Sequence, residues 1–203
     1  MQLARYFPTP IWSIDTTIDL SALKSLYEQL LEKDPKGRAV SNFGGWQSVE
    51  FMPKDFEVTQ QFANTVEELT NACLEDYGID TLDFKTTITN MWFSNNKKND
   101  FNQTHIHGGS FLSGTFYIEV PELENGCGEI VFNRNHFEEH FLSTIKGAIN
   151  KSTPLNSKTC KYLPKVGGLI VFPSYLQHCV LPSGVDEDRI SLSFNMDFNR
   201  RIL

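Results

Sequence analysis

The chain has 203 residues, of which 40% are hydrophobic and 21% are charged, and its formal net charge is -7. This length and balance predict a single domain over 1–203, with a core that needs no disulfide support. The acidic balance disfavours non-specific binding to a nucleic-acid backbone. No apolar stretch is long enough to cross a membrane.

The cysteines and the N-terminal stretch point to a reducing compartment. Four cysteines are widely scattered and none belongs to a CxxC pair: Cys73, Cys127, Cys160 and Cys179. Such spacing is typical of free thiols. The opening stretch MQLARYFPTPIW lacks the apolar run of a secretory signal. We therefore expect a cytoplasmic protein.

The 1–83 part of the chain predicts two helices. Residues 19–33 carry an apolar face of leucines and Tyr27 at helical spacing, with Asp19 or Ser21 as the N-cap. Residues 55–77 repeat the pattern, and Gly78 ends it. Neither helix carries obvious chemistry, so we expect both to pack on the outside of a sheet.

From residue 84 onward the hydrophobic period changes to two. The predicted strands are 84–93, 111–120, 128–133, 158–163, 168–172, 178–181 and 189–198. This 84–203 part predicts a jelly-roll core, so the fold class is mainly β with flanking helices (α+β). The strand at 189–198 alternates completely, which places Arg189 on one face with Ser191, Ser193 and Asn195. That polar face either lies in water or lines a ligand cavity.

All five histidines lie in the strand-rich half of the chain. His105 and His107 are two residues apart, so an extended segment places both rings on one side. His178 follows the apolar strand GGLIVFPS, and Arg189 comes eleven residues later. Two histidines plus one further ligand is an arrangement of non-haem iron(II) oxygenases, and a guanidinium can bind a carboxylate in a bidentate pair.

Two other features have structural interpretations. HFEEH at 136–140 matches the HxxEH zinc-peptidase string, but it lies between strands without a helical apolar pattern, so we expect a solvated loop or a lid. Trp46 and Trp92 are expected in the core or the cavity wall.

Four sequence blocks resemble a known enzyme family. They are GGWQS at 44–48, HIHGGSFLSGTFYI at 105–118, GGLIVFPSYLQHCVLP at 167–182 and RISLSFN at 189–195. Together they resemble the 2-oxoglutarate/iron(II)-dependent dioxygenase superfamily, and within it a 2-oxoglutarate–iron(II) oxygenase family found in phages and marine bacteria. The resemblance runs from LARYFPTPIW to Asn195. It implies a double-stranded β-helix of the jelly-roll or cupin-like type, with iron(II) and 2-oxoglutarate as cofactors.

The resemblance also implies roles for individual residues. His105 and His178 take the places of the two metal histidines, and His107 takes the place of an acidic ligand. Arg189 binds the far carboxylate of 2-oxoglutarate, with Ser191 completing an RxS pair. Tyr117 stands where some relatives place a tyrosine on the same carboxylate. Most of the superfamily has Asp or Glu at the position of His107. His107 is therefore either a third metal ligand or, with water as the third ligand, a group that contacts the metal ligands or binds the substrate.

Two functions follow from these residues. The favoured one is a dioxygenase that hydroxylates a substrate and releases succinate and CO2. The alternative is a cupin-like metal- or carboxylate-binding module without oxygenase activity, in which Arg189 simply pairs with an acid of the preceding loop. The substrate, whether a small molecule, a protein side chain or a nucleobase, is left open, as is the choice between monomer and homodimer.

Overall fold

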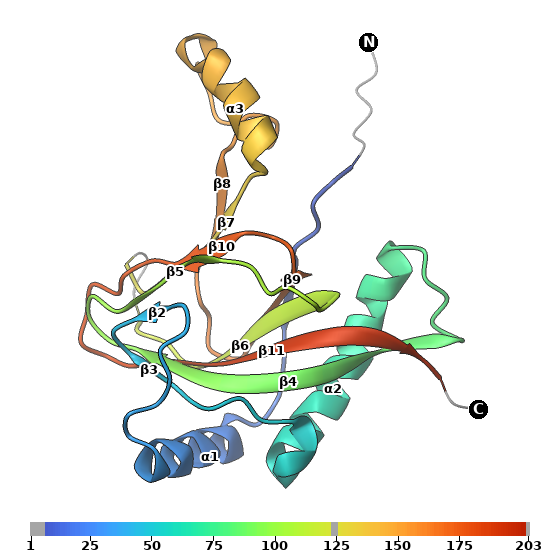
Figure 1. Ribbon diagram of the computed structural model, residues 1–203, viewed down its shortest axis with the longest axis vertical. Coiled ribbons are helices and arrows are strands. Elements are labelled where there is room, and N and C mark those ends of the chain that lie inside the picture. The colour runs from blue at the N-terminus through green and yellow to red at the C-terminus, as the bar shows by residue number, and fades with distance from the viewer. Residues whose placement is uncertain (1–6, 123–125, 202–203) are drawn as a thin grey trace.

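The computed structural model describes residues 7–122 and 126–201. Within them two antiparallel β-sheets face each other, and two helices cover the outer side of the larger sheet (Figure 1). Residues 3–6 of the N-terminal stretch that carried the resemblance lie outside the described residues. The sequence also predicts a turn at Asn125-Gly126, and Asn125 lies outside the described residues.

The larger sheet has six strands and the smaller has five. In spatial order the larger contains β1 (Trp12–Asp15), β9 (Gly168–Pro173), β6 (Leu112–Glu119), β11 (Arg189–Arg200), β4 (Phe84–Asn96) and β3 (Trp46–Gln47). The smaller contains β2 (Asn42–Phe43), β5 (Phe101–His105), β10 (His178–Val180), β7 (Ile130–Asn133) and β8 (Thr159–Tyr162). All of these strand pairs are antiparallel.

The two predicted N-terminal helices form close to their expected bounds. They are α1 (Leu20–Lys33) and α2 (Glu57–Asp76), and a short 3-10 turn, η1 (Pro53–Asp55), precedes α2. Asp19 caps α1 by accepting a hydrogen bond from the Ser21 backbone N–H at 2.9 Å. Gly78 has φ +73, a left-handed conformation that glycine adopts without strain, just beyond the end of α2.

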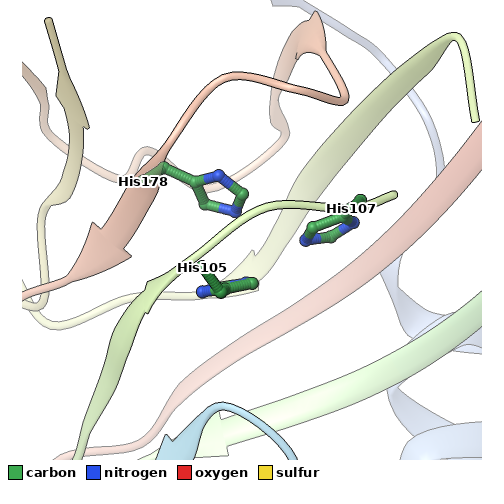
Figure 2. Close-up of side chains that lie close together, drawn as sticks. All are labelled: His105, His107 and His178. Carbon is green, nitrogen blue, oxygen red and sulfur yellow. The ribbon is translucent and has the colours of Figure 1, made fainter. Parts of the chain in front are cut away.

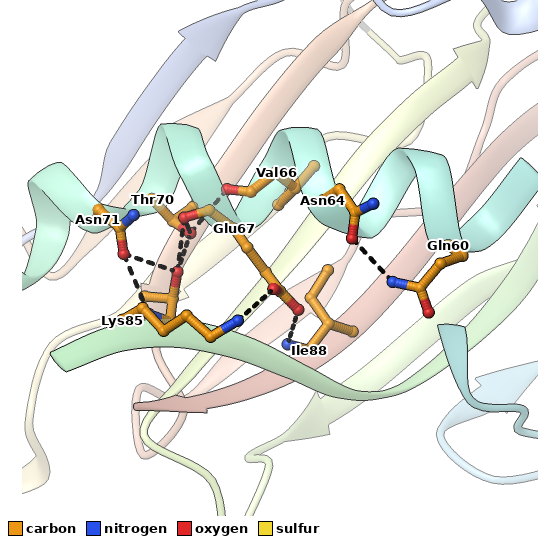
Figure 3. Close-up of polar contacts among 9 residues, drawn as sticks. Gln60, Asn64, Val66, Glu67, Thr70, Asn71, Lys85 and Ile88 are labelled. Carbon is orange, nitrogen blue, oxygen red and sulfur yellow. Dashed lines mark hydrogen bonds and ion pairs between the residues drawn. The ribbon is translucent and has the colours of Figure 1, made fainter. Parts of the chain in front are cut away.

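A group of polar contacts joins α2 to strand β4 (Figure 3). The Thr86 hydroxyl donates to the backbone oxygen of Glu67 at 2.8 Å and lies 2.9 Å from the Thr70 hydroxyl. The Glu67 carboxylate accepts the Ile88 backbone N–H at 2.8 Å. These contacts supply partners for buried polar groups where the helix crosses the strand.

The two faces of strand β11 have different surroundings: one packs into the apolar core beneath the helices, and the other faces the space between the two sheets. Its even positions from Ile190 to Met196, among them Leu192 and Phe194, are buried in the core cluster that includes residues of α1 and α2. Its odd positions line a cavity between the two sheets: Arg189, Ser191, Ser193 and Asn195. The cavity interpretation of this polar face is therefore confirmed.

Several elements differ from the expectation. Besides its helices, the 1–83 part supplies β1, β2 and β3. Strand β5 was not predicted, because its sequence FNQTH has no apolar alternation. The expected loop at 136–140 is wrong: these residues begin helix α3 (His136–Thr144), followed by η2 (Lys146–Ala148). Asn135 caps α3, but Leu142 is its one buried residue, so the apolar pattern was too weak to predict a helix. Figure 1 shows α3 beyond β7 and β8, away from the two sheets.

Candidate metal centre

Three histidines meet on the inner side of the smaller sheet. His105 ends β5 and His178 begins β10, and the two are directly paired in the strand register. His107 follows two residues after His105, where its backbone N–H donates to the Ser174 carbonyl at 2.9 Å. Figure 2 shows the three rings close together, and one ligand atom from each lies within 4.8 Å of the others. The structure thus brings together all three predicted metal ligands.

Each of these imidazoles has its Nδ1 atom engaged by an oxygen. The Nδ1 of His105 lies 2.7 Å from the Gln103 carbonyl, and that of His178 lies 2.8 Å from the Leu176 carbonyl. A carbonyl can only accept, so both Nδ1 atoms carry the proton. The Nδ1 of His107 lies 2.6 Å from the Asn195 Oδ1. This pattern leaves all three Nε2 atoms unprotonated, as a metal ligand requires.

Burial keeps the three rings neutral. Desolvation, with the nearby His105 ring, lowers the pKa of His178 to about 3. Desolvation also lowers the pKa of His105 and of His107. Neutral imidazoles in an interior position are ready to coordinate a cation, because no proton has to be displaced at neutral pH.

The histidines open into a cavity of about 210 Å³ between the two sheets. Arg189 and Ser191, both predicted to bind the co-substrate, also line this cavity. Trp92 lines the cavity, which is one of the two positions predicted for it, the core and the cavity wall. Trp46 is buried in the core cluster on the other side of the larger sheet. The cavity therefore places a metal-binding triad and a buried cation in one space.

Arg189 is a buried guanidinium without an acidic partner. Its side chain is 2% exposed, and its Nε has no hydrogen-bond partner among the described residues. Two of the three acids of the preceding loop pair elsewhere: Asp188 with Lys97 at 3.3 Å and Asp186 with Lys98 at 3.8 Å. A buried charge is costly unless it is paired, so this position calls for an anion from outside the chain.

The neighbours of Arg189 shape its position. Its guanidinium carbon lies 5.0 Å from the centroid of the Tyr117 ring, and Tyr117 pairs directly with Ser191 in the sheet. Burial raises the pKa of Tyr117, so its hydroxyl stays protonated, and it has no hydrogen-bond partner among the described residues. On another side lies Gly128, where an added Cβ would come within 2.7 Å of the Arg189 side chain.

The residues present fit a divalent transition metal and a carboxylate ligand. Three neutral imidazole donors suit iron(II) and its neighbours in the first transition row. The buried Arg189 guanidinium, whose Nε has no hydrogen-bond partner among the described residues, can offer the bidentate donors that a carboxylate needs. The other two histidines, His136 and His140, are on α3 and belong to no metal-binding group found among the described residues. Without a third ligand, HFEEH does not form a zinc site.

Sequence reasoning assigned no role to Asn195 or Glu50. The Asn195 Oδ1 accepts hydrogen bonds from both His107 and the Ser113 hydroxyl. The sequence could have indicated a role for Asn195, because the alternation of β11 places it on the same face as Arg189. Glu50 also lines the cavity, and its backbone position in a short irregular segment gave no signal.

Comparison with known proteins gives a family match and a fold match. The profile of the family described as "Putative 2OG-Fe(II) oxygenase" matches residues 90–195, just over half of the chain. This range contains the three histidines, Arg189 and Asn195. No curated protein sequence matches. Among the described helices, none combines the length and apolar character needed to cross a membrane.

Solved structures of low sequence identity share the fold. A prolyl-4-hydroxylase of Pseudomonas putida is 16% identical, with a TM-score of 0.61 over 96% of this chain and 94% of its own. The collagen prolyl hydroxylase of Paramecium Bursaria Chlorella virus-1, solved with 2OG, is 19% identical, with a TM-score of 0.59 over 95% and 96%. HygX of Streptomyces hygroscopicus, solved with nickel, 2-oxoglutarate and hygromycin B, is 11% identical, with a TM-score of 0.62 over 93% and 83%. The expected double-stranded β-helix is confirmed.

Proposed function

Because this chain belongs to the 2OG-Fe(II) oxygenase family, we propose that His105, His107 and His178 hold its iron(II) and that Arg189 holds its 2-oxoglutarate. Family membership makes the chain an oxidoreductase and favours the oxygenase over the non-catalytic module. The observation that carries the residue roles is the meeting of a neutral histidine triad and an unpaired buried guanidinium in one cavity.

The chain's own residues would bind and orient the reactants. Arg189 pairs with the far carboxylate of 2-oxoglutarate, with Ser191 beside it and Tyr117 packed against the guanidinium. The neutral Tyr117 hydroxyl, which lacks a partner, can donate to the same carboxylate. When bound, iron(II) would activate dioxygen, the oxidant, which would oxidise 2-oxoglutarate to succinate and CO2 and insert its other oxygen atom into the substrate.

We assign His107 to the metal rather than to a position behind it. Its Nδ1 is engaged by Asn195 in the same way that carbonyls engage the other two rings. Its Nε2 therefore has no proton and is available as a donor. A third neutral ligand in place of a carboxylate leaves the metal site more positive by one charge.

Hydroxylation of a substrate C–H group is the proposed outcome, and a small molecule or a protein side chain is the proposed kind of substrate. A cytoplasmic location is supported by the four cysteines, all of which are free. The formal charge of -7 supports a substrate other than nucleic acid. Monomer and homodimer both agree with the fold.

The proposal is tested by anaerobic absorption spectroscopy. Iron(II) and 2-oxoglutarate added to the protein should give the charge-transfer band of a bound iron–2-oxo-acid complex. Arg189→Ala should require at least about tenfold more 2-oxoglutarate, because it removes a charge-assisted pair. Arg200→Ala, at the exposed end of the same strand, should behave as the wild type. Iron-loaded wild type without the band would contradict the proposal.

A further inference from the structure

The cavity contains two charged side chains of opposite sign besides the histidines. Arg189 is buried, whereas Glu50 is exposed, so the negative group lies at the open end and the positive group at the closed end. Among the residues that the structure describes, no lysine and no second arginine lines the cavity. Once Arg189 is paired with the co-substrate carboxylate, Glu50 is the unbalanced charge that an entering molecule meets.

Glu50 is held in place without being neutralised. The Asn90 side-chain amide donates to one of its carboxylate oxygens at 2.9 Å. Among the described residues no lysine or arginine forms an ion pair with Glu50, and its other carboxylate oxygen accepts no hydrogen bond. A carboxylate oriented by a neutral amide keeps its full charge and one free oxygen for a ligand.

An aromatic side chain lines the same cavity as Glu50 and the three histidines. Trp92 lines the cavity, with its ring centroid 5.4 Å from that of His107. A carboxylate and an indole that line one cavity can together bind an organic cation, through ion pairing and cation–π contact.

The size of the cavity limits what can enter. Its volume of about 210 Å³ is below the ~300–1,000 Å³ of pockets that enclose a drug-sized ligand. With 2-oxoglutarate inside, only one extended arm of a second molecule fits alongside Trp92. Ile106 and Val40, both exposed and both lining the cavity, can contact the apolar part of such an arm.

From these observations we infer that the primary substrate is an organic cation, whose ammonium or guanidinium group is recognised by Glu50 and Trp92. This inference rests on the proposed function, because it takes Arg189 to be occupied by 2-oxoglutarate. The cationic arm belongs either to a lysine or arginine side chain of a peptide or to a free polyamine.

The test is succinate formation by the iron(II)-loaded protein with matched probes. N-acetyl-lysine methylamide is compared with its norleucine counterpart, N-acetyl-arginine methylamide with its citrulline counterpart, and spermidine with 1,8-octanediol. At least one cation should raise succinate release above the substrate-free rate, with a kcat/KM about tenfold or more above that of its neutral counterpart. Stimulation by an N-acetyl amino-acid methylamide would indicate a peptide side chain as the substrate, and stimulation by spermidine would indicate a free polyamine.

The matched variants are Glu50→Gln and Glu68→Gln. Gln at position 50 can still accept the Asn90 hydrogen bond but has no charge, so the preference for the cation should fall about tenfold. Glu68 is exposed on α2, and its variant should keep the wild-type preference. Equal rates with cationic and neutral probes, no stimulation by any cation, or an unchanged preference in Glu50→Gln would overturn the inference. The anaerobic band, recorded on the same samples, shows whether the proposed function itself holds.

Discussion

The Asn195 side chain connects the metal-binding triad to the larger sheet. Its Oδ1 accepts from His107 at 2.6 Å and from Ser113 at 2.8 Å, and the Ser113 hydroxyl lies 2.8 Å from that of Ser174. Gln103 and Leu176 hold the other two rings through backbone carbonyls, which substitution cannot remove. Asn195 is therefore the one positioning group of the triad that mutagenesis can test.

We expect Asn195→Ala to weaken divalent-metal binding by about 10–100-fold, the usual effect of removing a hydrogen bond behind a metal-ligating histidine. The variant leaves the His107 ring free to rotate and to change tautomer. Calorimetric titration with cobalt(II) measures the affinity, and Asn195→Asp, which keeps an acceptor oxygen, should restore much of it. Asn199→Ala, on an exposed part of the same strand, is the control. Unchanged affinity in Asn195→Ala would show that His107 does not need this contact.

Gly128 provides the space that the Arg189 side chain occupies. Its φ is +81, and an added Cβ would come 2.7 Å from Cδ and 3.0 Å from Nε of Arg189. We expect Gly128→Ala to displace the guanidinium and to weaken 2-oxoglutarate binding by about tenfold or more, with little effect on cobalt(II) affinity. Gly147→Ala, where an added Cβ meets nothing within 4 Å, should change neither affinity. Equal loss of metal affinity in Gly128→Ala would indicate general misfolding instead.

At the scale of elements, helix α2 is attached to β4 by a carboxylate that burial destabilises. Desolvation raises the pKa of Glu67, although the Ile88 N–H and the Lys85 charge act in the opposite direction. Because the folded-state pKa lies above the unfolded one, the free energy of unfolding falls as the pH rises through this interval. The ionised side chain therefore reduces stability at neutral pH.

We expect Glu67→Gln to raise the Tm at pH 7 by about 2–4 °C, the shift that ~1 kcal/mol produces in a chain of this size. Glutamine can still accept the Ile88 hydrogen bond and has no charge to desolvate. The gain should shrink below about pH 4, where the wild-type carboxyl is protonated. Thermal unfolding at several pH values checks this, with Glu68→Gln as the exposed neighbour. A pH-independent gain would disagree with the pKa argument.

Elements with a strong period could be predicted from the sequence, and short or polar ones could not. The complete alternation of 189–198 identified the strand and its polar face, but not whether that face lies in water or lines the cavity. Strand β5 was missed because hydrogen bonds with β2 and β10 define it, not its own sequence. Helix α3 was missed because it stands away from the sheets and buries a single residue.

At the scale of the whole molecule, the site is assembled from both sheets. His105 and His178 come from the smaller sheet, and Arg189 and Asn195 from the larger, with the cavity between them. The motif order along the chain predicted which histidines meet, because a family pattern fixes which residues come together. It could not predict that Glu50 faces the same cavity, because this depends on how an irregular segment packs against β4.

His107 stands where most of the wider superfamily has a carboxylate, so its contact with iron is the central claim. X-ray absorption spectroscopy of the anaerobic iron(II)-loaded protein counts the imidazole ligands directly. The account predicts three imidazoles in the wild type and two in His107→Ala, with three retained in His140→Ala. Two imidazoles in the wild type, unchanged by His107→Ala, would contradict a three-histidine centre.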